Sequence, residues 1–292
     1  MIRYDMPLYR PPSEAHSLIF QATLGCSHNR CAFCVSYRSK RFRAKPEAAL
    51  FAEIDWAAGE LPYTRRVFLA DGDAFVLSTN RLLRLLARLR AAFPKLERVS
   101  AYACPRNFAK KSVDDMGRIR EAGLAMLFVG AESGDDEVLR RIDKGVTADE
   151  MIALCKKPQE AGIDLSLTVI TGLGGRRLME RHARNTARLL DEIRPRFAAA
   201  LTLMREPRDP PFEVAFGDPE FAPLSPEEDL AECRLLLEHM HADGITFRAN
   251  HASNYVSLAG DLQADKPRLL AQIDKALENP AASFRPEFMR GL

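Results

Sequence analysis

The loop that decides this fold reads Cys26-Ser-His-Asn-Arg-Cys31-Ala-Phe-Cys34, and it directly follows an apolar, strand-like run at residues 17–24. Three thiols in so short a loop point to a common partner. A disulfide would use two of them and strand the third, and a mononuclear zinc site would need a fourth donor such as His28. A cubane iron–sulfur cluster can be held by three thiolates, which leaves one iron open to a small ligand.

Composition narrows the class of protein. The hydrophobic share of 47% is ordinary for a globular chain, and a net charge of +2 indicates neither a nucleic-acid nor a membrane partner. No apolar run is long enough to cross a bilayer, and the N-terminal residues lack a signal-peptide pattern. Six cysteines, three of them clustered, fit a reducing compartment better than a disulfide framework, so we expect a cytoplasmic protein.

Strand-like and helix-like segments alternate along most of the chain. Strict alternation predicts a parallel sheet with helical crossovers, and strands that are apolar throughout are typical of a sheet buried on both faces. The sequence therefore predicts an α/β fold, either doubly wound or barrel-like. The expected strands are residues 17–24, 66–70, 98–104, 125–130, 165–170 and 197–204, and the expected helices begin near residues 46, 79, 112, 135, 147 and 179.

The cysteine loop, with an aromatic residue just before its third cysteine, resembles the radical S-adenosylmethionine (SAM) superfamily. The commonest spacing in that superfamily is three and then two residues between the cysteines, whereas here it is four and then two. The resemblance implies that Cys26, Cys31 and Cys34 bind a [4Fe-4S] cluster, that SAM chelates the fourth iron, and that Phe33 lies against the adenine. It also implies a partial (β/α)6 TIM-like barrel at residues 17–205, after a lead-in at 1–16 and before a small C-terminal extension at 206–292 that packs on the barrel.

Two strand ends carry motifs that are similar to SAM-binding motifs of the superfamily. Gly72 and Asp73 follow the second strand, where the glycine would let the backbone approach and the acid would pair with the SAM ammonium. Glu132 and Ser133 follow the fourth strand and resemble the Glu-Ser-Gly stretch of methylthiotransferases and coproporphyrinogen dehydrogenases. The alternatives are an ordinary turn at Asp73 and a pairing of Glu132 with a basic residue such as Arg106.

The fifth and sixth strand ends complete the expected SAM site. Ile170 and Gly172 resemble the fifth-strand motif that packs beside adenine, and Met204 would complete that wall, although a methionine at this position also fits core packing. Cys104 ends the third strand and is expected to be a buried thiol rather than a ligand. Cys155 and Cys233 lie in helical patterns and are predicted to belong to the core.

The C-terminal extension contains one polar cluster, residues 250–255, after a predicted helix that is capped by Ser225. His251 and Tyr255 are its candidate catalytic residues, because histidine titrates in the range that suits general acid–base work. The alternative is a turn whose side chains satisfy its own backbone.

A basic run lies between the cysteine loop and the first long helix. It is either a solvated surface or a clamp for an anionic substrate or an electron donor. Its residues are Arg38, Lys40, Arg41, Arg43 and Lys45.

The resemblance thus implies an enzyme that cleaves SAM reductively and produces a 5′-deoxyadenosyl radical, which abstracts hydrogen from an unidentified substrate, either a small molecule or one of unknown class. A one-electron donor such as flavodoxin or ferredoxin is the implied partner. Two alternatives stay open: an iron–sulfur electron-transfer or regulatory protein without SAM turnover, and a zinc-binding module. The sequence shows no second cysteine cluster, which argues against a methylthiotransferase.

Overall fold

The computed structural model describes residues 1–205 and 209–291, and the chain forms two compact units. The first unit contains residues 1–29, 34–129 and 154–165, and the second contains residues 30–33, 130–153 and 166–292. Residues 206–208 and 292, which the sequence assigns to the extension, lie outside the described residues. The predicted divisions after residues 16 and 205 stay predictions.

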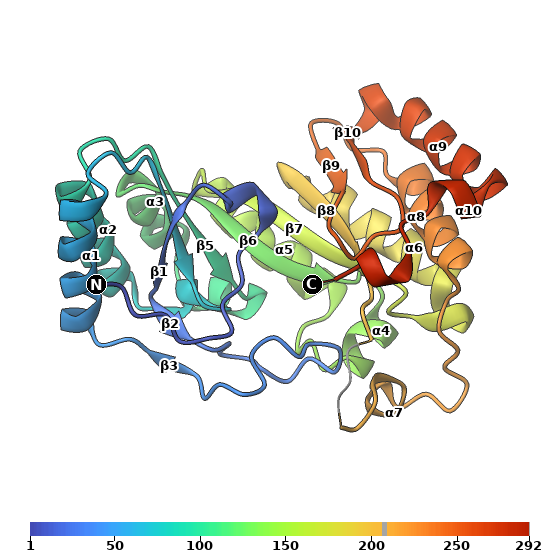
Figure 1. Ribbon diagram of the computed structural model, residues 1–292, viewed down its shortest axis with the longest axis horizontal. Coiled ribbons are helices and arrows are strands. Elements are labelled where there is room, and N and C mark those ends of the chain that lie inside the picture. The colour runs from blue at the N-terminus through green and yellow to red at the C-terminus, as the bar shows by residue number, and fades with distance from the viewer. Residues whose placement is uncertain (206–208, 292) are drawn as a thin grey trace. The chain divides into compact units, whose positions relative to one another are not determined.

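The first unit is built on a parallel sheet. Its strands are ordered β1, β4, β5, β6, and each neighbouring pair is parallel. Helices α1 and α2 pack against one another, as do α2 and α3 (Figure 1). The bounds of these elements are β1 Leu18–Gln21, α1 Glu47–Glu60, β4 Arg66–Ala70, α2 Thr79–Ala92, β5 Arg98–Ala103, α3 Val113–Glu121, β6 Leu124–Glu132 and α5 Ala148–Glu160.

The run predicted as one strand at residues 17–24 is two strands. Gln21 ends β1, and the chain then turns into a short β2 (Thr23–Leu24) that pairs antiparallel with β3 (Arg43–Ala44). Residues 25–42, which include the cysteine loop, connect these two paired strands. The ends of this segment therefore lie close together in the first unit.

The second unit is also built on parallel strands and helices, and it includes the C-terminal extension. Strands β7, β8 and β9 are parallel neighbours, and β10 pairs antiparallel with β9. Helix α6 packs on α8, and α8 packs on α9 (Figure 1). The bounds are α4 Asp136–Arg141, β7 Asp164–Thr171, α6 Gly175–Ile193, β8 Phe197–Thr202, α7 Phe212–Phe216, α8 Pro226–His239, β9 Thr246–Ala249, β10 Leu258–Asp261, α9 Leu262–Glu278 and α10 Pro280–Ser283.

The α/β prediction is confirmed, and the strands and helices of the predicted partial (β/α)6 barrel are present in their predicted order. Two details differ. Helix α6 begins at Gly175 rather than near Met179, because the glycine-rich turn after β7 leads straight into it. The strand of the extension, β9, pairs in parallel with β8, so the extension continues the sheet. Ser225 caps α8 through a capping box with Glu228, as the sequence predicts.

No helix among the described residues is long and apolar enough to cross a membrane.

Candidate functional site

Asp73 lies at the carboxyl end of β4 and is fully buried. Its carboxylate accepts a hydrogen bond from the Ser27 hydroxyl in the cysteine loop. The Asn107 side-chain amide donates to both of its oxygens, at 2.7 Å to Oδ1 and 2.6 Å to Oδ2. The backbone N–H of Cys104, just after β5, donates to it at 3.3 Å. Asp73 therefore ties the beginning of the cysteine loop to two strand ends of the first unit. Burial raises its pKa despite these donors. Its predicted contact with the SAM ammonium stays a prediction.

Cys26 lies next to Cys104, with the two Sγ atoms 3.9 Å apart. Hydrogen bonding with the Cys104 thiol lowers the pKa of Cys26 to about 6, against the opposing effect of burial. The thiolate is the form that binds metal. Gly72 leaves room on the other side, because a Cβ there would lie 3.1 Å from the Cys26 Cβ and 2.6 Å from the Tyr37 ring.

The donor set of the loop suits a thiolate-bound cluster. All three cysteines are partly exposed rather than packed into a core. Partly exposed thiols are accessible to an incoming cluster, whereas inert structural cysteines are buried. Within residues 1–205 and 209–291, no three His, Cys, Asp or Glu side chains are grouped closely enough to hold a metal ion.

Glu132 and Ser133, predicted to bind SAM, already have partners in the second unit. The Glu132 carboxylate pairs with the Lys144 ammonium at 2.9 Å, so its basic partner is Lys144 and not Arg106. The Ser133 hydroxyl is buried and accepts a hydrogen bond from the Asp135 backbone N–H at 2.9 Å. Asp135 in turn caps α4. Their role toward SAM remains a prediction.

The turn after β7 is held by a buried pair. The Gly172 N–H donates to the Glu232 carboxylate at 2.5 Å, and the other oxygen of Glu232 lies 2.8 Å from His182 Nδ1. Burial lowers the pKa of His182, but the Glu232 charge outweighs it, and the net shift is upward. This pair fixes Gly172, which has a φ of +82° that glycine adopts readily.

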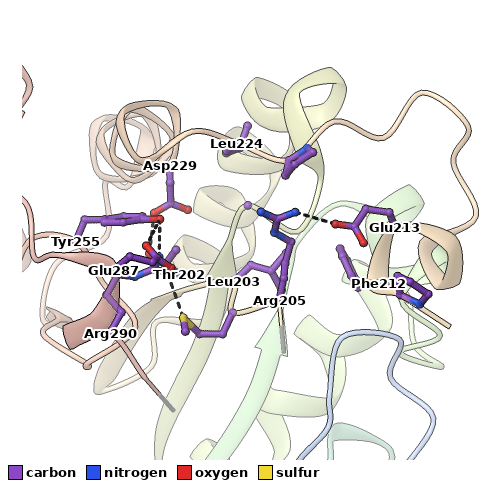
Figure 2. Close-up of a pocket in the computed structure, with 14 residues that line it drawn as sticks. Thr202, Leu203, Arg205, Phe212, Glu213, Leu224, Asp229, Tyr255, Glu287 and Arg290 are labelled. Atoms are coloured by element: carbon purple, nitrogen blue, oxygen red, sulfur yellow. Dashed lines mark hydrogen bonds and ion pairs between the residues drawn. The ribbon is translucent and has the colours of Figure 1, made fainter. Parts of the chain in front are cut away.

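A cavity of about 510 Å³ in the second unit is lined by three predicted residues, Gly172, Met204 and Tyr255. Figure 2 shows this cavity, with Tyr255 labelled. Gly172 follows β7, Met204 follows β8, and Tyr255 comes from the loop between β9 and β10. Ile170 is buried and does not line this cavity, and Phe33 is partly exposed in the cysteine loop. The structure therefore joins part of the expected adenine wall to one of the two candidate catalytic residues.

His251, the other candidate catalytic residue, does not line this cavity. Its Nδ1 lies 3.0 Å from the Ser253 hydroxyl and accepts the Ser253 N–H at 3.1 Å. Burial lowers its pKa, helped by the charge of Arg285. The bond from the Ser253 N–H to His251 agrees with the alternative of a turn whose side chains satisfy its own backbone. Three further carbonyls of the loop, those of His251, Ala252 and Asn254, accept from Arg285, which lies outside the loop.

Sequence reasoning missed the charged residues of the cavity. Asp229 on α8, Arg205 after β8, Glu213 on α7 and the pair Glu287–Arg290 near the C-terminus all line it. Acids in the first turn of a capped helix and arginines near a chain end are common surface features, so no local pattern distinguishes these residues.

The basic run after the cysteine loop is mostly engaged within the first unit. Lys40 is buried and pairs with Asp71 at 2.9 Å, which contradicts its interpretation as part of a solvated surface. Lys45 pairs with Glu53 at 2.6 Å, and Arg43 pairs with Asp5 at 3.2 Å. These contacts leave fewer charges for an anionic partner than the sequence suggests.

Comparisons with known proteins identify a family and similar folds. Residues 20–190 match the family described as the Radical SAM superfamily. Among solved structures, coproporphyrinogen III oxidase (HemN) from Escherichia coli is similar with a TM-score of 0.57 and 18% identity, over 76% of this chain and 50% of that one. Methylornithine synthase (PylB) is similar with a TM-score of 0.53 and 16% identity, over 77% and 63% of the two chains.

A curated relative, the heme chaperone HemW of Bacillus subtilis (strain 168), is 25% identical over 132 residues. That match covers 44% of this chain and 35% of HemW, so the chain matches about a third of the length of this relative.

Proposed function

Because the chain belongs to the radical SAM superfamily, we propose that it is an enzyme that holds a [4Fe-4S] cluster through Cys26, Cys31 and Cys34 and cleaves SAM. Held by these residues and reduced, such a cluster would supply the electron for cleavage of SAM to methionine and a 5′-deoxyadenosyl radical, which would abstract hydrogen from a substrate. The observation that carries the proposal is the loop of three partly exposed thiols at the start of the matched region.

The residues of the first unit have a positioning role in this proposal. Asp73 fixes Ser27, the residue after the first ligand, and so orients Cys26. Gly72 keeps the backbone beside Cys26 free of a side chain, and the lowered pKa of Cys26 favours the thiolate at neutral pH. A one-electron donor such as flavodoxin or ferredoxin is the proposed partner.

The test is electron paramagnetic resonance of protein reconstituted with iron and sulfide without oxygen and then reduced, with and without SAM. We expect a [4Fe-4S] signal that shifts when SAM is added and is lost in Cys31→Ala. Cys155→Ala is the matched control, since it removes a buried cysteine of α5. It should keep the signal.

Other outcomes of this experiment favour the alternatives. A cluster signal that ignores SAM would support the electron-transfer or regulatory protein. Bound zinc without a competent cluster would overturn the proposal. A signal retained in Cys31→Ala would overturn the assignment of that ligand.

Heme binding is a second candidate function, favoured only by the match to the heme chaperone. Titration of the chain with hemin, followed by its absorbance spectrum, tests it directly. A saturable spectral change at one equivalent supports heme binding, and an unchanged spectrum of free hemin rejects it.

A further inference from the structure

Cys104 is a cysteine of the first unit that the proposed function does not use. It directly follows β5, and the sequence predicts a buried thiol at this position. The structure instead leaves Cys104 partly exposed, with its Sγ 3.9 Å from the Sγ of Cys26. Cys26 is partly exposed as well, so a small molecule in solution has access to this pair of thiols.

One buried carboxylate holds the backbones of both cysteines. The Ser27 hydroxyl, next to Cys26 in the chain, donates a hydrogen bond to Asp73. The Cys104 backbone N–H donates to the same carboxylate at 3.3 Å. Asp73 is fully buried, so these bonds are protected from competing water. The two thiols therefore lie together because the backbone places them there.

The other side of Cys26 is fixed in the same way. The Gly25 backbone N–H donates to the buried carboxylate of Asp71 at 3.1 Å. Gly72 packs closely beside it, because a Cβ there would lie 3.1 Å from the Cys26 Cβ. Cys26 is thus held from both neighbours in the chain, and bringing its sulfur to Cys104 costs little further conformational entropy.

Two thiols at this separation can form a disulfide. The bond requires the Sγ atoms to lie about 2.0 Å apart, so from 3.9 Å they must approach by about 2 Å. Rotation about the Cα–Cβ bond of one cysteine moves its sulfur by that much. Because both residues belong to the first unit, the reaction is intramolecular, and each thiol has a high effective concentration at the other.

We propose that Cys26 and Cys104 form a reversible disulfide in the cluster-free chain, by exchange with a small-molecule disulfide such as oxidised glutathione. One protein sulfur attacks the small disulfide, which forms a mixed disulfide and releases one thiol. The second protein sulfur attacks the protein sulfur of that mixed disulfide and releases the other thiol. Two protein thiols are oxidised and one small disulfide is reduced to two thiols, which carry away the two protons.

This disulfide competes with the cluster for Cys26. A sulfur that is joined to Cys104 cannot be a thiolate, and the thiolate is the form that binds iron. The bond itself does not require the cluster, and only this competition rests on the proposed function. The pair makes cluster loading depend on the redox state of the chain, because the oxidised form lacks one of the three ligands until a thiol reduces it.

Peptide mapping of the full, cluster-free chain tests the bond directly. The chain is equilibrated without oxygen in mixtures of oxidised and reduced glutathione, and the remaining thiols are alkylated with N-ethylmaleimide. A tryptic digest is then analysed by mass spectrometry without reduction. Trypsin cleaves after Arg30, which separates Cys26 from the other two cysteines of the loop. It releases Cys104 in the peptide of residues 99–106.

We expect the peptide of Cys26 to be joined to the peptide of Cys104 by a bond that dithiothreitol removes. The joined form should exceed the glutathione adduct of Cys26 by at least about tenfold, since the neighbouring thiol has a higher effective concentration than glutathione.

Variants identify the partner. In Cys104→Ser the second thiol is gone, so Cys26 should keep glutathione as a mixed disulfide. Cys104→Ala provides the same test if the serine variant does not fold. Cys155→Ala is the matched control, because it removes a buried cysteine of α5, and it should leave the joined peptides unchanged.

A chain that is loaded with cluster before the oxidation tests the competition. The amount of joined peptides should fall at least about tenfold, because the loaded form has no thiol to offer at Cys26. If no cluster can be loaded at all, the proposed function fails, and the map of the cluster-free chain still decides whether the disulfide forms.

Four results would overturn the inference. The first is that Cys26 stays reduced or keeps glutathione in the natural chain, and the second is that it joins mainly another cysteine of the loop. The third is a bond between two copies of the chain, visible as a doubled mass on a non-reducing gel. The fourth is equal formation of the joined peptides with and without the cluster.

Discussion

Two buried aspartates, one in each unit, behave in opposite ways. Asp73 in the first unit accepts hydrogen bonds from Ser27, Asn107 and the backbone of Cys104, so both of its oxygens are occupied. Asp229 in the second unit accepts one from Thr202 and leaves Oδ1 without a partner among the described residues. The difference teaches that burial alone does not identify a ligand-binding carboxylate. A saturated carboxylate holds the protein together, and an unsaturated one beside a cavity can bind something else.

The largest expected effect comes from removing Asp73, the aspartate whose oxygens are both hydrogen-bonded. Asp73→Ala removes the acceptor of three donors, namely the partly buried Ser27 hydroxyl, the buried Asn107 amide and the Cys104 backbone N–H. With each unsatisfied buried donor costing about 1–3 kcal/mol, we expect a loss of roughly 5 kcal/mol in the free energy of unfolding. Urea unfolding followed by circular dichroism measures it. A loss below about 1 kcal/mol would mean that Asp73 is not a structural tie and would favour its ligand role.

Asp229→Asn tests the unsatisfied carboxylate, and we expect it to raise the free energy of unfolding where Asp73→Ala lowers it. The pKa of Asp229 rises from 3.8 to about 7 on folding, mainly because it is buried. Because the folded-state pKa lies above the unfolded value, the stabilising contribution of Asp229 to the free energy of unfolding is fully present below about pH 4. It is lost as the pH rises through about 7. Asparagine cannot ionise, so the variant should be more stable than the natural chain at pH 8, by up to about 4 kcal/mol.

The pH dependence is the diagnostic part of this prediction. The advantage of Asp229→Asn should be nearly constant above about pH 7 and should shrink between pH 7 and pH 5 in urea unfolding experiments. Glu278→Gln should show no such trend, since Glu278 is exposed. An advantage that is the same at both pH values would show that Asp229 does not change its protonation in this range.

Gly172→Ala sharpens the comparison at the unsatisfied oxygen. Its φ of +82° is unfavourable for alanine, and the new Cβ would lie 3.4 Å from Asp229 Oδ1 and from the Leu203 Cβ. We expect a loss of about 1–2 kcal/mol in stability from the backbone conformation. Urea unfolding followed by circular dichroism measures this loss. An unchanged stability would show that the backbone at residue 172 accepts a side chain without strain.

Arg205→Gln is the smallest expected effect and serves as the contrast within the same cavity. The side chains of Arg205 and Glu213 are 52% and 33% exposed, so their ion pair is screened by water. We expect a change of about 0.5 kcal/mol or less in the free energy of unfolding, measured by thermal unfolding. A loss above about 2 kcal/mol would show that water does not screen this ion pair.

Much of the fold could be predicted from the sequence because its signals are local. Buried strands such as β6 (Leu124–Glu132) are largely apolar runs, and Ser225 precedes a proline and two glutamates that form a recognisable helix start. The division of residues 17–24 into two strands could not be predicted, since it depends on pairing with Arg43 and Ala44 about twenty residues later. The pairing of β9 with β8 is likewise a tertiary event.

For the site, the sequence by itself determined the three-cysteine loop, because Cys26, Cys31 and Cys34 are neighbours in the chain and their chemistry needs no fold to be recognised. It also determined the strand-end glycines. Only the tertiary structure decided that Lys40 pairs with Asp71, that Glu132 pairs with Lys144, and that Asp229 and Arg290 line one cavity. The physical reason is that a charge acquires its role from what surrounds it once it is buried. Those neighbours come from strands and helices that are distant in sequence, and no local pattern records them.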